Sequence, residues 1–205
     1  MKLFYAPGTI SIAVAIALEE SGVPYTTHKI DFRNPDVSRP QLLEVNPKGR
    51  VPVLVTDHGI LTEAGALLDY VADLAPDDSL KPSDPFKAAK MREAMYYLAS
   101  TMHVNHAHKL RGARWADKEA SWEDMRAKVP ETMTACCAYV EENIITGPYV
   151  LGETFSIADA YLYVVSTWLK GDGVDITPFP KFNAFQKLME ERDCVKAVKA
   201  AGMLG

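Results

Sequence analysis

The chain begins with two short runs of β-forming residues, separated by a segment whose apolar positions follow a helical period. Residues 2–6 are rich in β-forming side chains and a Pro-Gly pair follows them, which predicts a short strand. Across residues 11–20 the apolar positions recur with a helical period, until a Ser-Gly pair ends the pattern. Residues 25–32 are again rich in β-formers and predict a second strand. Strand, helix and strand in this order indicate a βαβ unit with two parallel strands.

The following stretch predicts a hairpin and a further helix. Polar residues 33–40 predict a loop, and a short helix follows before the hairpin. Residues 51–56 and 60–61 predict two antiparallel strands around an Asp-His-Gly turn. Thr62 is predicted to cap a helix that runs to about Leu74. This part of the chain therefore predicts the order βαβ, short helix, ββα.

The second part of the chain has a purely helical pattern. Residues 77–85 are rich in Pro and Asp and mark a domain boundary. Ser156 and Asp159 match an S-x-x-D capping box, which predicts a structural role for both. We therefore expect an α/β domain over residues 1–76, a linker over 77–85, and an all-helical domain over 86–205. The periodic segments before a short end piece are 86–114, 122–143, 156–169 and 182–191.

Charge and composition exclude several classes of protein. A net charge of −5 and a pI near 5.6 argue against nucleic-acid and anionic-membrane binders, which need basic surfaces. The basic run at 109–114 is a solvated helix face or a local anion site. No apolar run reaches the ~18 residues of a membrane span. The apolar stretch within the first eight residues is shorter than that of a signal peptide. Three cysteines without a CxxC pair indicate core residues in a reducing compartment, so we expect a cytoplasmic protein.

One proline stands where a strand is predicted to begin. Residues 46–54 read Asn-Pro-Lys-Gly-Arg-Val-Pro-Val-Leu. A cis Val51–Pro52 bond would turn the N–H and C=O of Val51 away from the sheet, where a peptide-like ligand could pair with them. Alternatively, Pro47 and Pro52 only frame a loop, which is the more common arrangement for a single proline. The two interpretations stay open on these residues alone.

Three motifs together resemble the cytosolic glutathione transferases. They are residues 46–54, the Leu-Thr-Glu-Ala run at 61–64, and the Phe-Ser-Ile-Ala-Asp-Ala-Tyr-Leu run at 155–162. Residues 1–18 are most similar to the bacterial beta class. The resemblance implies a thioredoxin-like first domain, a cis bond at Pro52, and a homodimer. It also implies glutathione as co-substrate, a small electrophile as second substrate, and no metal.

The resemblance further implies which residues hold glutathione. The backbone of Val51, beside Pro52, would bind the cysteinyl part. The start of the following helix suits the α-carboxylate, and Glu63 would accept from the ammonium group. Ala64 replaces the serine of the family, so one hydrogen bond of ~0.5–1.5 kcal/mol is lost and the backbone N–H remains. Arg33 lies where the beta class has a basic residue near the glycyl carboxylate.

The reactive thiol must be converted to a thiolate. The beta class has a cysteine where this chain has Ile10, so no mixed disulfide with glutathione can form there. The remaining candidates to donate a hydrogen bond are, in order, Ser11, Thr9 and Tyr5. A hydroxyl and a helix N-terminus together would lower a thiol pKa of ~8.5 by roughly one to one and a half units. Ser11 could equally serve as a helix N-cap.

Two histidines are further candidates for the thiol chemistry. His103 and His106 face the same side of the predicted helix, whereas His108 lies well round from both. This arrangement does not predict a zinc site. His103 matches the class histidine, while Val104 occupies the position of the class lysine, so His106 is the candidate to assist proton transfer.

The sequence leaves several functions open. We expect a glutathione transferase, with a low-turnover glutathione or hydrophobic-ligand binding protein as the alternative, because Ile10 and Ala64 replace two site residues. A glutathione-dependent isomerase or dehalogenase on the same scaffold is a third interpretation. Asn105 is a further polar candidate beside the two histidines. Four more residues of the helical part could line the second-substrate pocket, although aromatic residues at helical spacing more often belong to the core: Tyr97, Arg111, Trp115 and Trp168.

Overall fold

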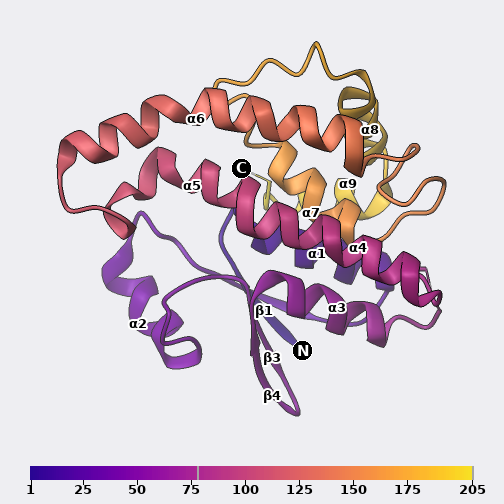
Figure 1. Ribbon diagram of the computed structural model, residues 1–205. Helices are drawn as coiled ribbons and strands as arrows, with labels where there is room; N and C mark the ends of the chain where they lie inside the picture. Colours follow the sequence, from indigo (N-terminus) through magenta and orange to yellow (C-terminus); the bar gives the residue numbers. More distant parts are fainter. Residues whose placement is uncertain (78, 205) are drawn as a thin grey trace.

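The strands form one mixed sheet. The computed structural model describes residues 1–77 and 79–204, and within them the four strands lie in the order β2-β1-β3-β4 (Figure 1). β1 pairs parallel with β2 and antiparallel with β3, which in turn pairs antiparallel with β4. The βαβ unit and the hairpin are therefore confirmed. The strands are β1 (Lys2–Tyr5), β2 (Thr26–Lys29), β3 (Val53–Thr56) and β4 (Gly59–Thr62).

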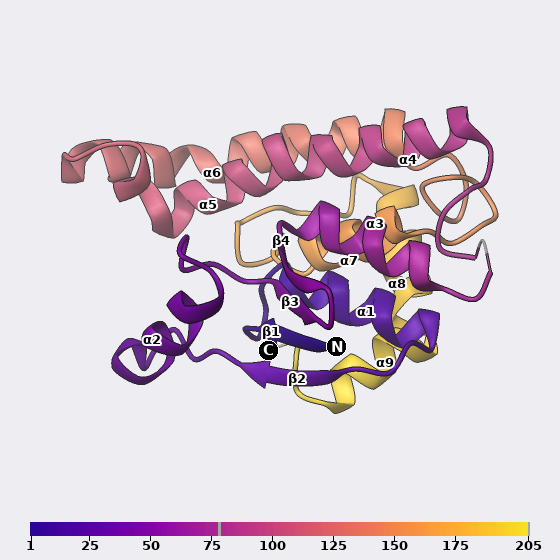
Figure 2. The same cartoon turned by 90° about the horizontal axis from the view of Figure 1, so that it is seen from below.

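The helices complete the first domain and build the whole of the second. Figures 1 and 2 both show the α4–α5 rod and α6 side by side on the outside of the second domain, with α7 beneath them. The α/β first domain and helical second domain are confirmed. The helical elements are α1 (Ser11–Ser21), α2 (Pro35–Val45), α3 (Ala64–Leu74), α4 (Pro85–Tyr97), η1 (Leu98–Met102), α5 (His103–Arg111), η2 (Gly112–Arg114), α6 (Glu119–Tyr139), η3 (Val140–Ile144), α7 (Ile157–Ser166), α8 (Pro180–Glu190) and α9 (Asp193–Ala200).

Helix α1 lies at the centre of the molecule. Every residue of 11–18 is buried, because the helix is apolar on all sides rather than on one face. It packs against β1 and α3 of the first domain and against α7 and α9 of the second. One continuous apolar core therefore joins the two domains.

The predicted loop at residues 33–40 is wrong, because α2 begins at Pro35. The N–H groups of the first helical turn have no acceptor within the helix, so a proline loses no hydrogen bond there. Its fixed φ angle also suits the start of a helix. The helix buries only Ser38 and Leu42, and Pro40 lies inside it. Because so few positions of this helix are buried, its apolar residues do not recur with a clear helical period in the sequence.

The predicted cap at Thr62 is also wrong. Thr62 is the last residue of β4 and pairs with Val53, so the strand continues to the edge of the helix. Helix α3 begins at Ala64, and Glu63 makes the junction with a φ of 75°. A non-glycine residue in this left-handed region is uncommon and costs conformational free energy. The strand-to-helix junction is therefore compressed into a single residue.

The long helix predicted at 86–114 is interrupted. A π-helical segment at Leu98–Met102 separates α4 from α5 and buries both of its end residues. Such segments accommodate extra residues in a turn and occur often at functional sites. Within residues 1–77 and 79–204, none of the helices has the length and apolar character needed to cross a bilayer.

The capping box at the start of α7 is confirmed. Asp159 is fully buried and its carboxylate accepts from Ser156 N–H (2.8 Å), Ser156 Oγ–H (2.9 Å) and Val150 N–H (2.7 Å). The N–H of Ile157 donates to the carbonyl of Leu80 (2.9 Å), which ties the segment before α4 to this helix. One carboxylate therefore fixes both the start of α7 and the loop that precedes it.

Replacing this carboxylate should destabilise the fold strongly. In Asp159→Ala, three buried donors lose their acceptor, and we expect the free energy of unfolding to fall by about 3 kcal/mol or more. Urea denaturation measures the change. Asp193→Ala, at the exposed start of α9, is the matched control and should change stability by less than about 1 kcal/mol. Equal losses in the two variants would contradict this role.

Candidate active site

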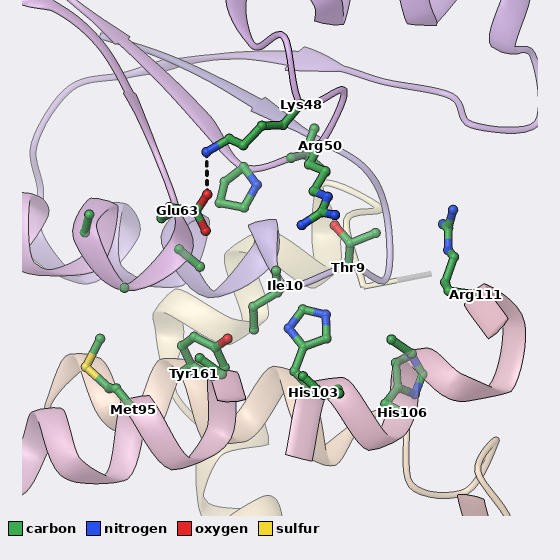
Figure 3. A pocket seen from close by; sticks show the side chains of 18 of the residues that line it. Thr9, Ile10, Lys48, Arg50, Glu63, Met95, His103, His106, Arg111 and Tyr161 are labelled. Carbon is green, nitrogen blue, oxygen red and sulfur yellow. Dashed lines mark hydrogen bonds and ion pairs between the residues drawn. The ribbon is translucent and has the colours of Figure 1, made fainter. Parts of the chain in front are cut away.

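A cavity of about 960 Å³ opens between the two domains. The first domain contributes the loop before α1, the turn before β3 and the start of α3. The second domain contributes α4, α5 and η2, together with Tyr161 and Trp168. Figure 3 shows the side chains of both domains converging on this space. A ligand held here would contact both domains at once.

The turn before β3 is fixed by a buried asparagine. Asn46 is buried; its Nδ2 donates to the carbonyl of Arg50 (2.7 Å) and its Oδ1 accepts from the N–H of Lys48 (3.1 Å). The Val51–Pro52 bond is cis, as the resemblance implied, and both residues line the cavity. The β1–β3 ladder begins only at Val53. The backbone of Val51 therefore lies at the cavity wall, outside the sheet.

The start of α3 forms the adjoining wall. Glu63, Ala64 and Gly65 line the cavity, and the first N–H groups of a helix have no acceptor within it. The carboxylate of Glu63 pairs with the ammonium of Lys48, which also donates to Thr62 Oγ1 (2.9 Å). Free N–H donors and a carboxylate thus lie side by side, which suits a ligand that carries both a carboxylate and an ammonium group.

The three candidate hydroxyls have different environments. Ser11 is fully buried; its Oγ lies 3.1 Å from Ala6 N, 3.2 Å from Ala6 O and 2.7 Å from Thr9 Oγ1. Thr9 lines the cavity, and its hydroxyl lies 2.8 Å from Ala6 O. Tyr5 is buried in β1. Neither Ser11 nor Tyr5 belongs to the described cavity lining, so Thr9, expected second after Ser11, is the one of the three hydroxyl residues that lines the cavity. Ser11 is not an N-cap either, because it is the first residue of the helix and its side chain points back to Ala6.

His103 and His106 face the cavity together, as their spacing predicts. His106 stacks on Trp168 with ring centroids 4.3 Å apart, and its Nδ1 lies 2.7 Å from Asp172 Oδ2. The Asp172 carboxylate is fully buried and is also 3.3 Å from Lys109 Nζ. A carboxylate oxygen accepts a hydrogen bond, so this contact favours the tautomer of His106 that carries its proton on Nδ1 and leaves Nε2 as an acceptor.

Trp168 links this histidine to the loop of the first domain. Its indole N–H donates to the carbonyl of Gly8 (2.9 Å), and the N–H of Gly8 donates to the carbonyl of Met203 (2.9 Å). The residue before Thr9 is therefore held by two parts of the second domain. His108 points elsewhere and packs against Trp115, as the helical spacing predicts.

His103 is a neutral imidazole at physiological pH. Burial, followed by the charges of His106, Arg114 and Arg50, lowers the pKa of His103 to about 4. A neutral ring can donate one hydrogen bond and accept another. His103 therefore contributes polarity to the cavity without a positive charge.

Some residues expected in the site lie outside it. The side chain of Arg33 is 88% exposed and pairs with Asp31 (3.2 Å), so it does not reach the described cavity lining. Tyr97 packs against Tyr139, and Asn105 Nδ2 is 3.3 Å from the sulfur of Cys136. The three other residues expected at the second-substrate pocket do line the cavity: Arg111, Trp115 and Trp168.

Several lining residues were not predicted as site residues. Arg92 donates twice to Asp69 (3.1 Å each) on the wall between α3 and α4. Arg50, Arg114 and Tyr161 also face the cavity. Arg50 lies in the 46–54 motif and Arg114 in the basic run at 109–114. From the sequence alone, these two arginines could not be distinguished from a solvated surface.

Comparisons with known proteins identify the family. Residues 3–79 match the model of the glutathione S-transferase N-terminal domain, and residues 105–201 match that of the C-terminal domain. The chain belongs to the glutathione S-transferase family. Glutathione S-transferase GstA of Escherichia coli O157:H7 is 32% identical, over 99% of this chain and all of its own.

Solved structures of other transferases agree with this assignment. A glutathione transferase homolog from Sulfitobacter, solved with bound glutathione, has a TM-score of 0.96 and 58% identity, covering 99% of this chain and 98% of its own. A beta class transferase from Sphingomonas chungbukensis has a TM-score of 0.86 and 28% identity over the full length of both chains. The transferase fold therefore extends along the whole chain.

The neutrality of His103 can be measured by NMR. Because burial holds its pKa near 4, its imidazole resonances should stay constant between pH 8 and pH 5, and should move only below that range. The resonances that vanish in His103→Gln identify the ring. The unfolded state takes up a proton near pH 6.5 while the folded state does not, so this group lowers stability as the pH falls from about 6.5 toward 4. A midpoint above pH 6 would contradict the assignment.

Proposed function

We propose that this transferase activates the thiol of glutathione and adds it to a small electrophile held against the helical domain. The observation that carries the proposal is the shared cavity, where the α3 N-terminus, Glu63 and the Val51 backbone form one wall and α5 forms the other. Glutathione itself is bound in the Sulfitobacter relative, which is 58% identical. The groups of the first wall match the chemistry of a peptide ligand with a free amino-acid end.

The γ-glutamyl and cysteinyl parts of glutathione each have a partner on the first wall. The α-carboxylate of the γ-glutamyl group accepts from the free N–H groups of Ala64 and Gly65, where the helix dipole favours an anion. Its ammonium group pairs with Glu63, in place of Lys48. The backbone of Val51 pairs with the cysteinyl part, and the cis bond to Pro52 keeps that backbone outside the sheet. Arg33 has no part in this scheme, because its guanidinium lies outside the cavity.

We assign thiolate stabilisation to Thr9 and a supporting role to Ser11. Each hydroxyl carries one proton. When the Ser11 hydroxyl donates to Ala6 O, the Thr9 hydroxyl is released to donate to the sulfur, while Ala6 N–H still donates to Ser11 Oγ. The pair can therefore exchange partners without leaving a buried donor or acceptor unsatisfied. Ile10, which replaces the class cysteine, offers only apolar contact.

The electrophile occupies the space between the thiolate and α5. The sulfur forms a bond to the electrophilic carbon, whose leaving group departs with its electron pair. The proton released from the thiol passes to Nε2 of His106, which Asp172 orients. His103, being neutral, donates one hydrogen bond to the sulfur or to the departing group. Trp168 stacks on His106 and shields it from solvent on one face.

Further properties follow from the family rather than from the site. We propose a homodimer, since large apolar side chains outside the described cavity lining stay exposed, among them Phe86 (74%), Ile60 (48%) and Leu74 (40%). We also propose that the linker at 77–85 separates the domains, since α3 ends at Leu74 and α4 begins at Pro85. A cytoplasmic location and a role in detoxification are proposed as well, because the free cysteines fit a reducing compartment.

Removing the Thr9 hydroxyl should raise the pKa of the bound thiol. A hydrogen bond to a thiolate is worth about 1.5 kcal/mol, so Thr9→Val should raise that pKa by about one unit and lower the conjugation rate about tenfold at pH 6.5. The pH dependence of thiolate absorbance in the glutathione complex measures the first effect, and conjugation to 1-chloro-2,4-dinitrobenzene measures the second.

Two variants serve as controls for this assignment. Thr9→Ser keeps the hydroxyl and should retain most of the activity. Ser11→Ala should lower the stability of the fold, while its thiol pKa changes less than that of Thr9→Val. The reverse order would return the role to Ser11. Binding of glutathione with no turnover above background in the wild type would make the protein a binding protein, and no binding would refute both functions.

Glu63 should contribute to glutathione affinity through the ammonium group. In Glu63→Gln, the loss of a charge-assisted hydrogen bond should raise the Kd for glutathione about tenfold. Isothermal titration calorimetry measures it. Glu44→Gln, on the exposed side of α2 and outside the described cavity lining, is the charge-matched control and should leave the Kd unchanged. An unaltered Kd in both variants would place the ammonium group elsewhere.

A further inference from the structure

The cavity concentrates positive charge in an acidic protein. Seven charged side chains line it, of which five are cations and two are carboxylates, whereas the whole chain carries a net charge of −5. Such a local excess of one sign raises the concentration of oppositely charged ligands at the site. The cations are Lys48, Arg50, Arg92, Arg111 and Arg114, and the carboxylates are Glu63 and Asp69.

Two of the five cations are already paired. Lys48 forms its ion pair with Glu63. Arg92 forms two hydrogen bonds to the Asp69 carboxylate, both of 3.1 Å, in the bidentate geometry typical of a stable guanidinium pair. These pairs neutralise two of the cations on the cavity wall formed by α3, α4 and the turn before β3.

The other three cations have no such partner. In the part of the chain that the structure describes, no carboxylate lies within 4.0 Å of the guanidinium groups of Arg50, Arg111 or Arg114. Figure 3 shows Arg50 facing His103 across the cavity, and Arg111 extending from the end of α5 toward the first domain. Three guanidinium groups from both domains therefore share one space.

These like charges interact with one another. Partial burial, together with the positive charges of Arg50 and Arg111, lowers the pKa of Arg114. The helix dipole favours cations near the C-terminal end of a helix. This is the simplest reason for Arg111 to end α5 and for Arg114 to lie just after it. That reason does not extend to Arg50, which lies in a loop, nor to the convergence of all three on the cavity. An anion between them would relieve the repulsion.

Glutathione uses only part of this positive charge. Its thiolate form has two carboxylates, a thiolate and one ammonium group, about −2 in all, against an excess of three cations in the cavity lining. Arg50 belongs to the glutathione wall and is available to the glycyl carboxylate. Arg111 and Arg114 belong to the opposite wall, beside the apolar surfaces of Trp168 and Leu110.

We infer that Arg111 and Arg114 bind an anionic group, such as a carboxylate, on the second substrate, so that the enzyme prefers acidic electrophiles with an apolar body. This inference rests on the proposed transferase function and names the substrate class of the same site. The acid would be held by charge-assisted hydrogen bonds from the helical domain, and its apolar part would lie against Trp168, near the thiolate.

A matched pair of substrates tests the preference. 4-Chloro-3-nitrobenzoate and its methyl ester share one reactive carbon and differ in a negative charge. For each substrate, kcat/KM is divided by the rate constant of its uncatalysed reaction with glutathione. In the wild type, this corrected value should be at least about tenfold higher for the acid than for the ester. Arg111→Gln and Arg114→Gln should each lose about tenfold on the acid and less than about twofold on the ester, with the KM for glutathione unchanged. Arg39→Gln, an exposed arginine on α2, is the control and should behave as the wild type.

Several outcomes would overturn the inference. Equal corrected values for acid and ester would show that the wall does not select anions. A raised KM for glutathione in both variants, with equal losses on both substrates, would assign the two arginines to glutathione instead.

A binding measurement separates this inference from the proposed function. The unreactive 4-methyl-3-nitrobenzoate and its methyl ester can be titrated by calorimetry into protein saturated with S-methylglutathione. Tighter binding of the acid that is lost in Arg111→Gln and Arg114→Gln supports the inference even if no substrate is turned over. Equal binding of acid and ester overturns it, whereas absence of conjugation with the ester refutes only the proposed reaction.

Discussion

The structure depends on the burial of one helix that is apolar on every side. No single layer can cover such a helix, so α1 packs both against β1 and α3 of the first domain and against α7 and α9 of the second. The hydrophobic effect that drives this burial is non-directional, and it is satisfied only when both domains are present. The residues immediately before α1, from Gly8 to Ile10, line the cavity, so it lies at the N-terminal end of this helix and between the domains that cover it. The site is therefore a consequence of how the central helix is covered.

The same packing controls the loop that presents Thr9. Gly8 is held through its carbonyl by Trp168 and through its N–H by Met203, so the second domain fixes the position of a first-domain residue. Trp168 also stacks on His106, whose other contact is the buried Asp172. The hydroxyl of Thr9 and the imidazole of His106, to which we assign thiolate stabilisation and proton transfer, are thus both positioned with the help of one indole ring.

The sequence was informative where structure is decided locally. The capping box of Ser156 and Asp159 needs only four consecutive residues, and the strand and helix order follows from apolar periods. The short helix before the hairpin was predicted, but the first turns of α2 were taken for a loop, because only Ser38 and Leu42 are buried and its prolines resemble loop signals.

The choice among site residues depends on rotation and packing that no local pattern records. Thr9 and Ser11 are two residues apart, yet one faces the cavity and the other faces Ala6. Similarly, Arg33 and Arg50 are both loop arginines, and only tertiary packing brings Arg50 to the cavity. Helix α5, which carries the opposite wall, has no buried residue. An exchange at those of its side chains that face the cavity therefore removes less apolar area from the core than an exchange in α1 would. The wall that we propose for the electrophile can thus change while the shared core stays as it is.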